Sequence, residues 1–232
     1  MLCIGHRGAA GHEPENTLRS VRRALEMGAD GVEIDVQLVG GELIVIHDSR
    51  LNRTTNGSGP LHRHSLAKIR QLDAGKGEQI PLLSEVLDAV DRKAFVNIEL
   101  KGRRTAGPVL ALLRDYTDRR GWQPSDFLIS SFHRPELRQL RGSGFPTGIL
   151  FGRSPRLFRP LARALGAWSI HVPLGHATPG LVSRVHAESL KLFVFTVNAP
   201  ADIERMERIG VDGIFSDFPD RQKNRTTAPV LG

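Results

Sequence analysis

The sequence predicts a (β/α)8 barrel, the TIM-barrel class of α/β fold. The chain has 232 residues, which suits one large domain. Short apolar runs alternate with helix-like stretches along most of it, which indicates βα units and a parallel sheet. Eight such runs occur, the number of strands in this barrel. An open, doubly wound sheet is the alternative that the alternation leaves open.

The expected strands are short and apolar. They comprise residues 2–5, 31–36, 94–100, 127–130, 147–151, 168–172, 192–197 and 212–216. Helices are expected between most of them, at residues 17–28, 106–121, 134–144, 155–166, 178–190 and 200–210. In the first of these, Leu18, Val21, Ala24 and Leu25 recur with helical spacing and form an apolar face.

An internal echo favours regular repetition. The segments GADGVEID (28–35) and GVDGIFSD (210–217) share a helix end, a Gly-x-Asp-Gly turn, an apolar strand and an acidic residue. A glycine just past a helix end accounts for Gly28 and Gly210. Repeated βα units of this kind are what a barrel requires.

One segment departs from the alternation. Gly40 and Gly41 separate two apolar runs, which predicts a hairpin in which residues 42–48 fold back beside the second strand. In a two-residue turn the paired positions sum to 81, so His47 is level with Ile34. The face of His47 depends on the turn type, because a slip of one residue inverts the face.

Residues 49–83 are polar and rich in glycine, and we expect them to form a small insertion near the active site. A helix is expected to restart at Ser84, as an N-cap with Glu85 after it. We therefore expect a single domain over residues 1–220. The tail, residues 221–232, has little to bury and is expected to be flexible.

Composition narrows the function classes. The formal net charge is +7, but the Lys and Arg residues are spread along the chain and aromatic residues make up only 6% of it, so we expect no nucleic-acid partner. No apolar run approaches the roughly 20 residues needed to cross a bilayer, and we expect no integral membrane segment. The N-terminus lacks the features of a signal peptide, and Cys3 is the single cysteine. We expect a cytoplasmic protein.

Acidic residues stand at expected strand ends. Functional groups of a βα barrel lie at the carboxyl ends of its strands. Glu33 and Asp35 share one face of the second strand, where Val32 and its alternating neighbours pack outward, and Glu99 ends the next barrel strand. Three carboxylates would repel one another unless a cation neutralised them, and all-oxygen ligands select Mg²⁺ or Ca²⁺. The competing interpretation pairs each carboxylate with a Lys or Arg.

Histidines and cations occupy neighbouring strand ends. His6 follows the first strand and His47 the returning strand, and two imidazoles suit a general acid and general base. Arg7 and Lys101 bring fixed positive charge to the same mouth, where they can hold a phosphate or neutralise the carboxylates. A cation, a phosphate clamp and an acid/base pair together indicate phosphoester hydrolysis.

These residues resemble a known family. HRG (6–8), ENT (15–17), the pair Glu33 and Asp35, HD (47–48), IELK (98–101), SSF (130–132), TVN (196–198) and GIFSDFPD (213–220) occur in the order found in glycerophosphodiester phosphodiesterases. The resemblance spans residues 4 to about 220. That family has a (β/α)8 fold with a small insertion, and it hydrolyses diesters such as glycerophosphocholine or glycerophosphoethanolamine to glycerol 3-phosphate and an alcohol.

The resemblance implies roles for single residues. Glu33, Asp35 and Glu99 would bind one divalent cation, Mg²⁺ or Ca²⁺. His6 and His47 would be the acid/base pair, and Arg7 and Lys101 would hold the phosphate. Supporting positions are Glu15, Phe195 and Asn198. Glu15 has an alternative role as a carboxylate at a helix N-terminus.

The chain departs from the family's pattern at two places. Phe195 stands where the family often has Trp, and residues 216–219 read Ser-Asp-Phe-Pro where it often has Thr-Asp-Tyr-Pro. Both departures leave the preferred alcohol undetermined, and neither changes the expected reaction. The alternatives are a related barrel phospholipase acting on lysophospholipid or sphingomyelin, and a non-catalytic phosphometabolite-binding barrel. The sequence also leaves open the oligomeric state and whether a cyclic phosphate forms.

Overall fold

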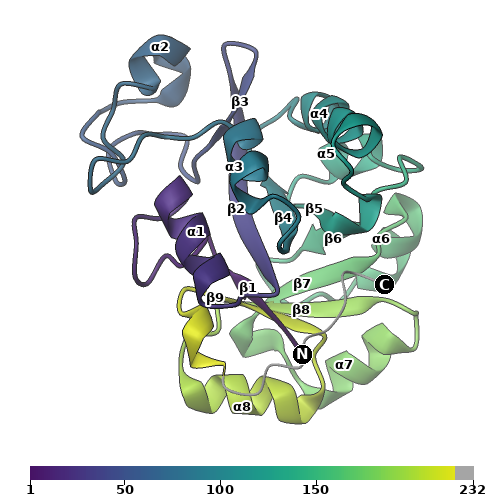
Figure 1. The fold of residues 1–232 in the computed structure, drawn as a ribbon. Helices are drawn as coiled ribbons and strands as arrows, with labels where there is room; N and C mark the ends of the chain where they lie inside the picture. The colour runs from purple at the N-terminus through teal and green to yellow at the C-terminus, as the bar shows by residue number, and fades with distance from the viewer. Residues whose placement is uncertain (223–232) are drawn as a thin grey trace.

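Eight parallel strands close into a barrel in the computed structural model, which describes residues 1–222 (Figure 1). The strand β1 pairs with both β2 and β9, so the sheet closes on itself and the open doubly wound alternative is excluded. The predicted (β/α)8 fold is confirmed. In chain order the barrel strands are β1 (Leu2–Gly5), β2 (Gly31–Val39), β4 (Phe95–Leu100), β5 (Phe127–Ser131), β6 (Thr147–Leu150), β7 (Ser169–Pro173), β8 (Lys191–Phe195) and β9 (Gly213–Ser216).

Helices surround the barrel, and each helix expected from the sequence is present within a few residues of its expected bounds. They are α1 (Leu18–Glu26), α3 (Leu83–Val90), α4 (Ala106–Arg119), α5 (Arg134–Gln139), α6 (Phe158–Leu165), α7 (Pro179–His186) and α8 (Pro200–Ile209), with the short α2 (Leu66–Ile69) outside the ring. Within residues 1–222, no helix combines the length and apolar character needed to cross a bilayer. The expected flexible tail falls mostly on residues 223–232, which lie outside the described residues. Before them, the buried side chain of Gln222 donates to the carbonyl of Met1.

The alternation along β2 decides which side chains reach the barrel axis. Val32, Ile34 and Val36 are fully buried against the surrounding helices, while Glu33 and Asp35 lie on the opposite, inward face. The antiparallel strand β3 (Glu42–Val45) returns beside β2 with the pairs Val36–Val45 and Val39–Glu42. These pairs have the predicted sum of 81, so the register of the hairpin is confirmed.

The start of α3 differs from the prediction. The helix begins at Leu83 with Leu82 as its N-cap residue, so the prediction of a cap at Ser84 was wrong. The Glu85 carboxylate accepts a hydrogen bond from the backbone N–H of Leu82 at 2.8 Å and satisfies a free amide at the helix end. The acidic residue after the serine, rather than the serine hydroxyl, does the capping.

The barrel interior below the site is filled by aromatic rings, and the repeated Gly-x-Asp-Gly turn makes room for them. A Cβ on Gly31 would lie 2.5 Å from the ring of Phe95, and one on Gly213 would lie 2.5 Å from the ring of Phe193. The aspartates of the two turns act alike: each carboxylate accepts from a backbone N–H of a neighbouring strand. Asp30 accepts from Cys3 and Asp212 from Leu192. The repeated sequence segment thus forms the same turn between a helix and a barrel strand in both places.

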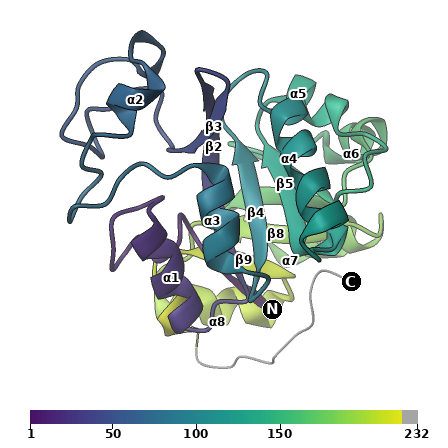
Figure 2. The ribbon, with the colours of Figure 1, turned by 45° about the horizontal axis from the view of Figure 1, so that its top comes forward.

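Residues 49–82 stand apart from the helical ring, beside the end of the β2–β3 hairpin (Figures 1 and 2). They have a small apolar cluster of their own, built around Leu51, Leu61, Ile69 and Ile80. Arg70 ties this segment to α3 through two hydrogen bonds to the Glu85 carboxylate. We call residues 49–82 the insertion.

Candidate active site

A cavity of about 210 Å³ opens at the carboxyl ends of the barrel strands. Its walls include most of the residues that the sequence indicated: His6, Arg7, Glu33, His47, Glu99, Lys101 and Phe195. Strand register brings them together. Asp35 is paired directly with Glu99, and Glu33 with Asn97, because β2 and β4 lie side by side in parallel. The inward faces of these two strands therefore present their polar side chains at the same two levels.

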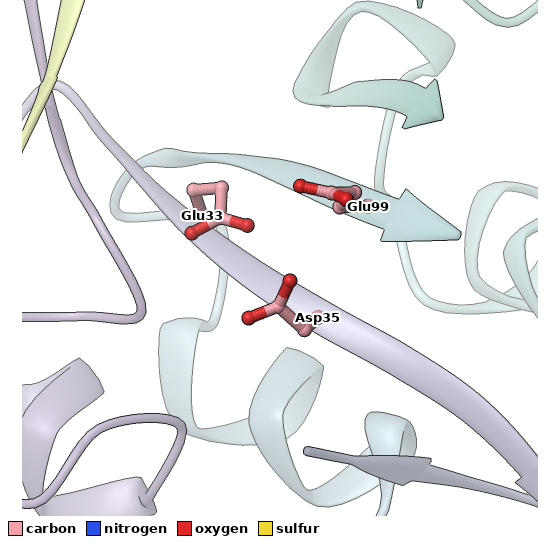
Figure 3. Close-up of side chains that lie close together, drawn as sticks. All are labelled: Glu33, Asp35 and Glu99. Atoms are coloured by element: carbon pink, nitrogen blue, oxygen red, sulfur yellow. The ribbon is translucent and has the colours of Figure 1, made fainter. Parts of the chain in front are cut away.

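Three carboxylates converge beside this cavity: Glu33 and Glu99 line its wall, whereas Asp35 does not. One oxygen each from Glu33, Asp35 and Glu99 lies within 4.8 Å of the other two (Figure 3). Hard cations take oxygen ligands at about 2.0–2.6 Å, so oxygens this close can share one ion. The Glu33 Oε1 atom is buried and has no hydrogen-bond partner. Buried polar atoms are normally hydrogen-bonded, so this oxygen is suited to coordinate a cation. The donor set fits a divalent cation.

The pKa values of the buried carboxylates also indicate a cation site. Burial, together with the charge of Asp35, raises the pKa of Glu33 to about 8. Burial and the same neighbouring charge also raise the pKa of Glu99. Ionised carboxylates here are costly unless positive charge offsets them, and a bound cation would supply that charge.

The turn after β1 positions His6. Arg7 has a φ of 51° and Gly8 a φ of 80°, and a Cβ on Gly8 would lie 2.5 Å or less from Ser20 atoms, so the HRG turn needs its glycine. The His6 Nδ1–H donates to the Asp217 carboxylate at 2.7 Å. Burial alone would lower the pKa of His6, but the hydrogen bond to Asp217 and the charge of Glu33 outweigh it and raise that pKa. Because Nδ1 is engaged, Nε2 is the nitrogen free for proton transfer.

His47, like His6, is held by a carboxylate at its Nδ1 atom. It follows β3 and lines the cavity with Glu33, so the face that the sequence left undetermined is the inward one. Its Nδ1–H donates to the Asp48 carboxylate at 2.6 Å, and its Nε2 accepts from Lys101 Nζ at 3.1 Å. Hydrogen bonds from Arg53 and His47 lower the pKa of Asp48 although burial opposes them. His47 Nε2 thus carries no proton in this arrangement.

Arg7 and Lys101 contact the carboxylates directly. Arg7 Nε lies 3.2 Å from Asp35 Oδ2, and Lys101 Nζ lies 2.8 Å from Glu99 Oε1. Burial would lower the pKa of both cations, but the neighbouring carboxylates outweigh it and raise both. Each side chain also lines the cavity, so the two predicted roles, neutralising the carboxylates and binding a phosphate, are compatible for these two groups.

The supporting positions have distinct surroundings. Phe195 lines the cavity and packs edge-on against Phe132, at 6.2 Å between ring centroids. Asn198 does not line the cavity, but its Nδ2 donates to Asp217 at 2.6 Å. Glu15 accepts from Arg7 at 2.7 Å and lies ahead of α1, whose N-cap is Thr17, so the alternative role at the helix N-terminus does not apply to it.

Sequence reasoning gave no role to the groups behind these residues. Asp48 and Asp217 hold the two histidines, Arg53 of the insertion binds both Glu15 and Asp48, and Asn16 donates to Asp35. Asn97 lines the cavity. For the His47–Asp48 pair, the adjacency of the two residues in the sequence could have indicated the contact. The pair His6–Asp217 joins residues 211 positions apart, so only the barrel topology reveals it.

Comparison with known proteins gives a uniform picture. The model of the "Glycerophosphoryl diester phosphodiesterase family" matches residues 6–221. A "Glycerophosphodiester phosphodiesterase" of Caldanaerobacter subterraneus is 37% identical over 237 residues, covering 94% of this chain and 95% of its own.

Two solved structures of similar sequence share the fold. An Oleispira antarctica phosphodiesterase in complex with the product sn-glycerol-3-phosphate has a TM-score of 0.87 at 30% identity, covering 95% of this chain and 94% of its own. A glycerophosphodiester phosphodiesterase from Agrobacterium tumefaciens has a TM-score of 0.81 at 31% identity, covering 95% of this chain and 98% of its own.

Proposed function

Because this chain belongs to the glycerophosphoryl diester phosphodiesterase family, we propose that it hydrolyses glycerophosphodiesters to sn-glycerol 3-phosphate and an alcohol with one divalent cation, Mg²⁺ or Ca²⁺. Its class is therefore that of a phosphoric diester hydrolase, and the non-catalytic alternative is set aside. The Oleispira antarctica relative, which holds sn-glycerol-3-phosphate as its product, supports the identity of the phosphate-bearing product. Glycerophosphocholine and glycerophosphoethanolamine are the first substrates to test.

One observation carries this proposal. Three inward carboxylates gather near two histidines, and His6, His47, Glu33 and Glu99 of this set line one cavity. Each histidine also has a carboxylate partner of its own. A purely structural set of ion pairs would not need two oriented imidazoles facing the same space.

We assign the ion to Glu33, Asp35 and Glu99. When bound there, a divalent cation would polarise a phosphoryl oxygen and offset its negative charge. The raised pKa of Glu33 and its unpartnered Oε1 atom support this assignment. Asn16 holds Asp35 from behind, through its Nδ2 atom at 2.9 Å, and keeps that carboxylate turned to the site.

The histidines move the protons. His47 Nε2 carries a lone pair rather than a proton, as the hydrogen bond from Lys101 requires. Once Lys101 binds the substrate phosphate instead, that lone pair is suited to accept a proton from the attacking hydroxyl. His6, whose pKa is raised, is suited to donate a proton from Nε2 to the departing alkoxide. An alcohol is a poor leaving group, so this second transfer contributes substantially to the rate. The carboxylates of Asp48 and Asp217 keep both rings in the required tautomer.

Arg7 and Lys101 hold the phosphate. Both reach the cavity wall while they contact the acidic cluster, so a phosphodiester entering the cavity would meet positive charge on either side of it. Arg7 is fixed by Glu15 through its Nη1 atom, which leaves the guanidinium little freedom to turn away.

The test is a substrate panel assayed with Mg²⁺, with Ca²⁺ and with a chelator. Release of glycerol 3-phosphate from at least one glycerophosphodiester, lost on chelation and restored by added metal, is the expected result. Failure to turn over any member with either metal contradicts the proposal. Lysophosphatidylcholine belongs in the panel, because a rate above that for glycerophosphocholine would favour the phospholipase alternative. Trapping a cyclic phosphate in the same assay would distinguish attack by the substrate's own hydroxyl from direct attack by water.

A further inference from the structure

A second groove adjoins the catalytic cavity on the side of β5 and β6. Its volume is about 380 Å³, and it shares two wall residues, Phe132 and Leu150, with the cavity. Phe132 is 42% exposed and stands between the two spaces, with Lys101 Nζ 5.7 Å from its ring centroid. One substituent of a phosphodiester held at Lys101 would therefore have a route past Phe132 into this groove.

The walls of the groove carry one sign of charge. Arg134, Arg153 and Arg156 line it, and no Asp or Glu does. Among residues 1–222, no carboxylate lies within ion-pair distance of any of these three guanidinium groups. Arg103 and Arg104 follow the neighbouring strand β4 and are exposed on the same sector of the mouth. Three consecutive strands are thus followed by arginines whose guanidinium groups have no ion-pair partner among residues 1–222. The nearby carboxylate of Glu136 instead accepts from backbone N–H groups at the start of α4.

The other side of the mouth is different. There Glu15 is bound by Arg7 and Arg53, and Glu13 by Arg19 and Lys76. Charges on that side are paired within the protein, whereas Arg134, Arg153 and Arg156 have no carboxylate partner among residues 1–222. Uncompensated guanidinium groups are suited to bind carboxylate or phosphate groups of a ligand.

We infer that this groove receives an alcohol moiety of the substrate that carries an anionic group. The inference rests on the proposed function and narrows it. Among glycerophosphodiesters, those whose alcohol carries a carboxylate or a further phosphate are preferred over those with a cationic choline or ethanolamine group. A second phosphate is the stronger ligand, because a guanidinium can bind it through two parallel hydrogen bonds. Leu157 and Phe132 shape the groove, and the arginines select the charge.

Two substrates that differ by one carboxylate test this inference. Glycerophosphoserine and glycerophosphoethanolamine are assayed side by side with the metal-loaded enzyme, and bis(glycerophospho)glycerol serves as a probe with a second phosphate. The expected kcat/KM is higher for the serine diester by about threefold to tenfold, the scale of one or two exposed charge contacts. The difference lies in KM, because the contacts are remote from the reacting bonds, and it shrinks as salt is added.

The double variant Arg153→Gln/Arg156→Gln is expected to bring the serine-to-ethanolamine ratio down by about threefold or more. Arg208→Gln removes the same kind of charge from the far end of α8 and is the matched control, for which the ratio is expected to stay at the wild-type value. A ratio that is unchanged in the double variant, or that favours ethanolamine in the wild type, overturns the inference.

Two further outcomes are separable. If lysophosphatidylcholine is turned over faster than glycerophosphocholine and Leu157→Ser abolishes that advantage, the groove holds an acyl chain and the inference is wrong. If no diester is turned over with either metal, the proposed function fails and the inference fails with it. That result differs from equal turnover of the serine and ethanolamine diesters, which contradicts the groove assignment alone.

Discussion

Each candidate proton-transfer histidine is paired with a carboxylate on the side away from the cavity. Asp217 binds Nδ1 of His6 and Asp48 binds Nδ1 of His47, at 2.7 and 2.6 Å. Asn198 in turn holds Asp217, and Arg53 holds Asp48. The orientation of the two rings is therefore determined by residues that do not themselves face the substrate.

Removal of either imidazole should slow the reaction severely. We expect His6→Ala and His47→Ala each to lower kcat by at least about 10²-fold, the usual scale for an acid/base group. Steady-state kinetics on the best diester of the panel provide the measurement, with His62→Ala in the insertion as the matched control. A near-normal kcat in either variant would remove that histidine from the mechanism.

The partners of the histidines can be tested separately from the histidines. Asp217→Asn keeps the size of the side chain but can hold the ring in the wrong tautomer. We expect kcat to fall by about 10-fold or more while KM stays within about twofold. A loss confined to KM would mean that Asp217 contributes to binding rather than to the proton-transfer geometry.

The acidic cluster offers a test that does not depend on turnover. Glu33→Gln and Asp35→Asn should abolish binding of Mg²⁺ or Ca²⁺ measured by calorimetry, with Glu207→Gln on α8 as a surface control. Without metal, folding above about pH 4.5 requires the Glu33 carboxylate to take up a proton, because its pKa is raised from 4.5 to about 8 in the folded protein. We therefore expect Glu33→Gln to raise the free energy of unfolding of the metal-free protein near pH 7. Full metal affinity in both variants would contradict the assignment of the ligands.

At the scale of the elements, the repeated Gly-x-Asp-Gly turn joins a helix end to a barrel strand twice. Gly31 and Gly213 leave room for the rings of Phe95 and Phe193, and the neighbouring aspartates bind amides of adjacent strands. The glycines are needed for space rather than for an unusual backbone angle, because neither has a positive φ.

Alanine at these positions should destabilise the barrel. We expect Gly31→Ala and Gly213→Ala each to lower the free energy of unfolding by about 1–3 kcal/mol, the cost of forcing an extra methyl group into a packed core. Gly107→Ala in the exposed first turn of α4, where nothing lies within 4 Å of the new Cβ, should be neutral or stabilising. Denaturant titration measures all three, and equal effects at the three positions would contradict the packing argument.

The sequence predicts those features that depend on residues close together in the chain better than those that depend on residues far apart in it. The βα alternation and the register of the Gly40–Gly41 hairpin follow from local patterns, and the structure has both. The cap of α3 was misassigned because a nearby carboxylate competed with Ser84 for the role. The links Arg53–Glu15 and His6–Asp217 connect separate elements, and no local pattern determines them.

At the scale of the whole molecule, one buried histidine makes stability depend on pH. His171 on β7 is buried in the cavity wall with its ring against Phe193 and Phe215, and burial lowers its pKa from 6.5 to about 3. Between about pH 6.5 and 3, the His171 imidazole is protonated in the unfolded chain but neutral in the folded protein. The free energy of unfolding should therefore fall as the pH decreases from about 6.5 towards 3, and it should not depend on His171 at higher pH.

The variant His171→Gln removes this titration. We expect its free energy of unfolding to decline less steeply than that of the wild type between pH 6.5 and 4, by up to about 1.4 kcal/mol per pH unit. Denaturant titrations at several pH values give the slope, and His62→Gln is the matched control for the loss of one histidine. Parallel curves for wild type and His171→Gln would show that His171 does not control acid stability.

Closure of the barrel between β1 and β9 sets a time at which the enzyme can become active. At a synthesis rate of about 5–20 residues per second, the ribosome needs about 10–40 s to make the chain between His6 and Asp217. Until then the nascent chain has the three carboxylates of the proposed metal site and His47, but β1 lacks its second neighbour and His6 lacks its carboxylate. The proposed acid/base pair is completed only after β9 has been synthesised. A chain interrupted before that strand would contain the residues of the proposed metal site without the carboxylate that holds His6.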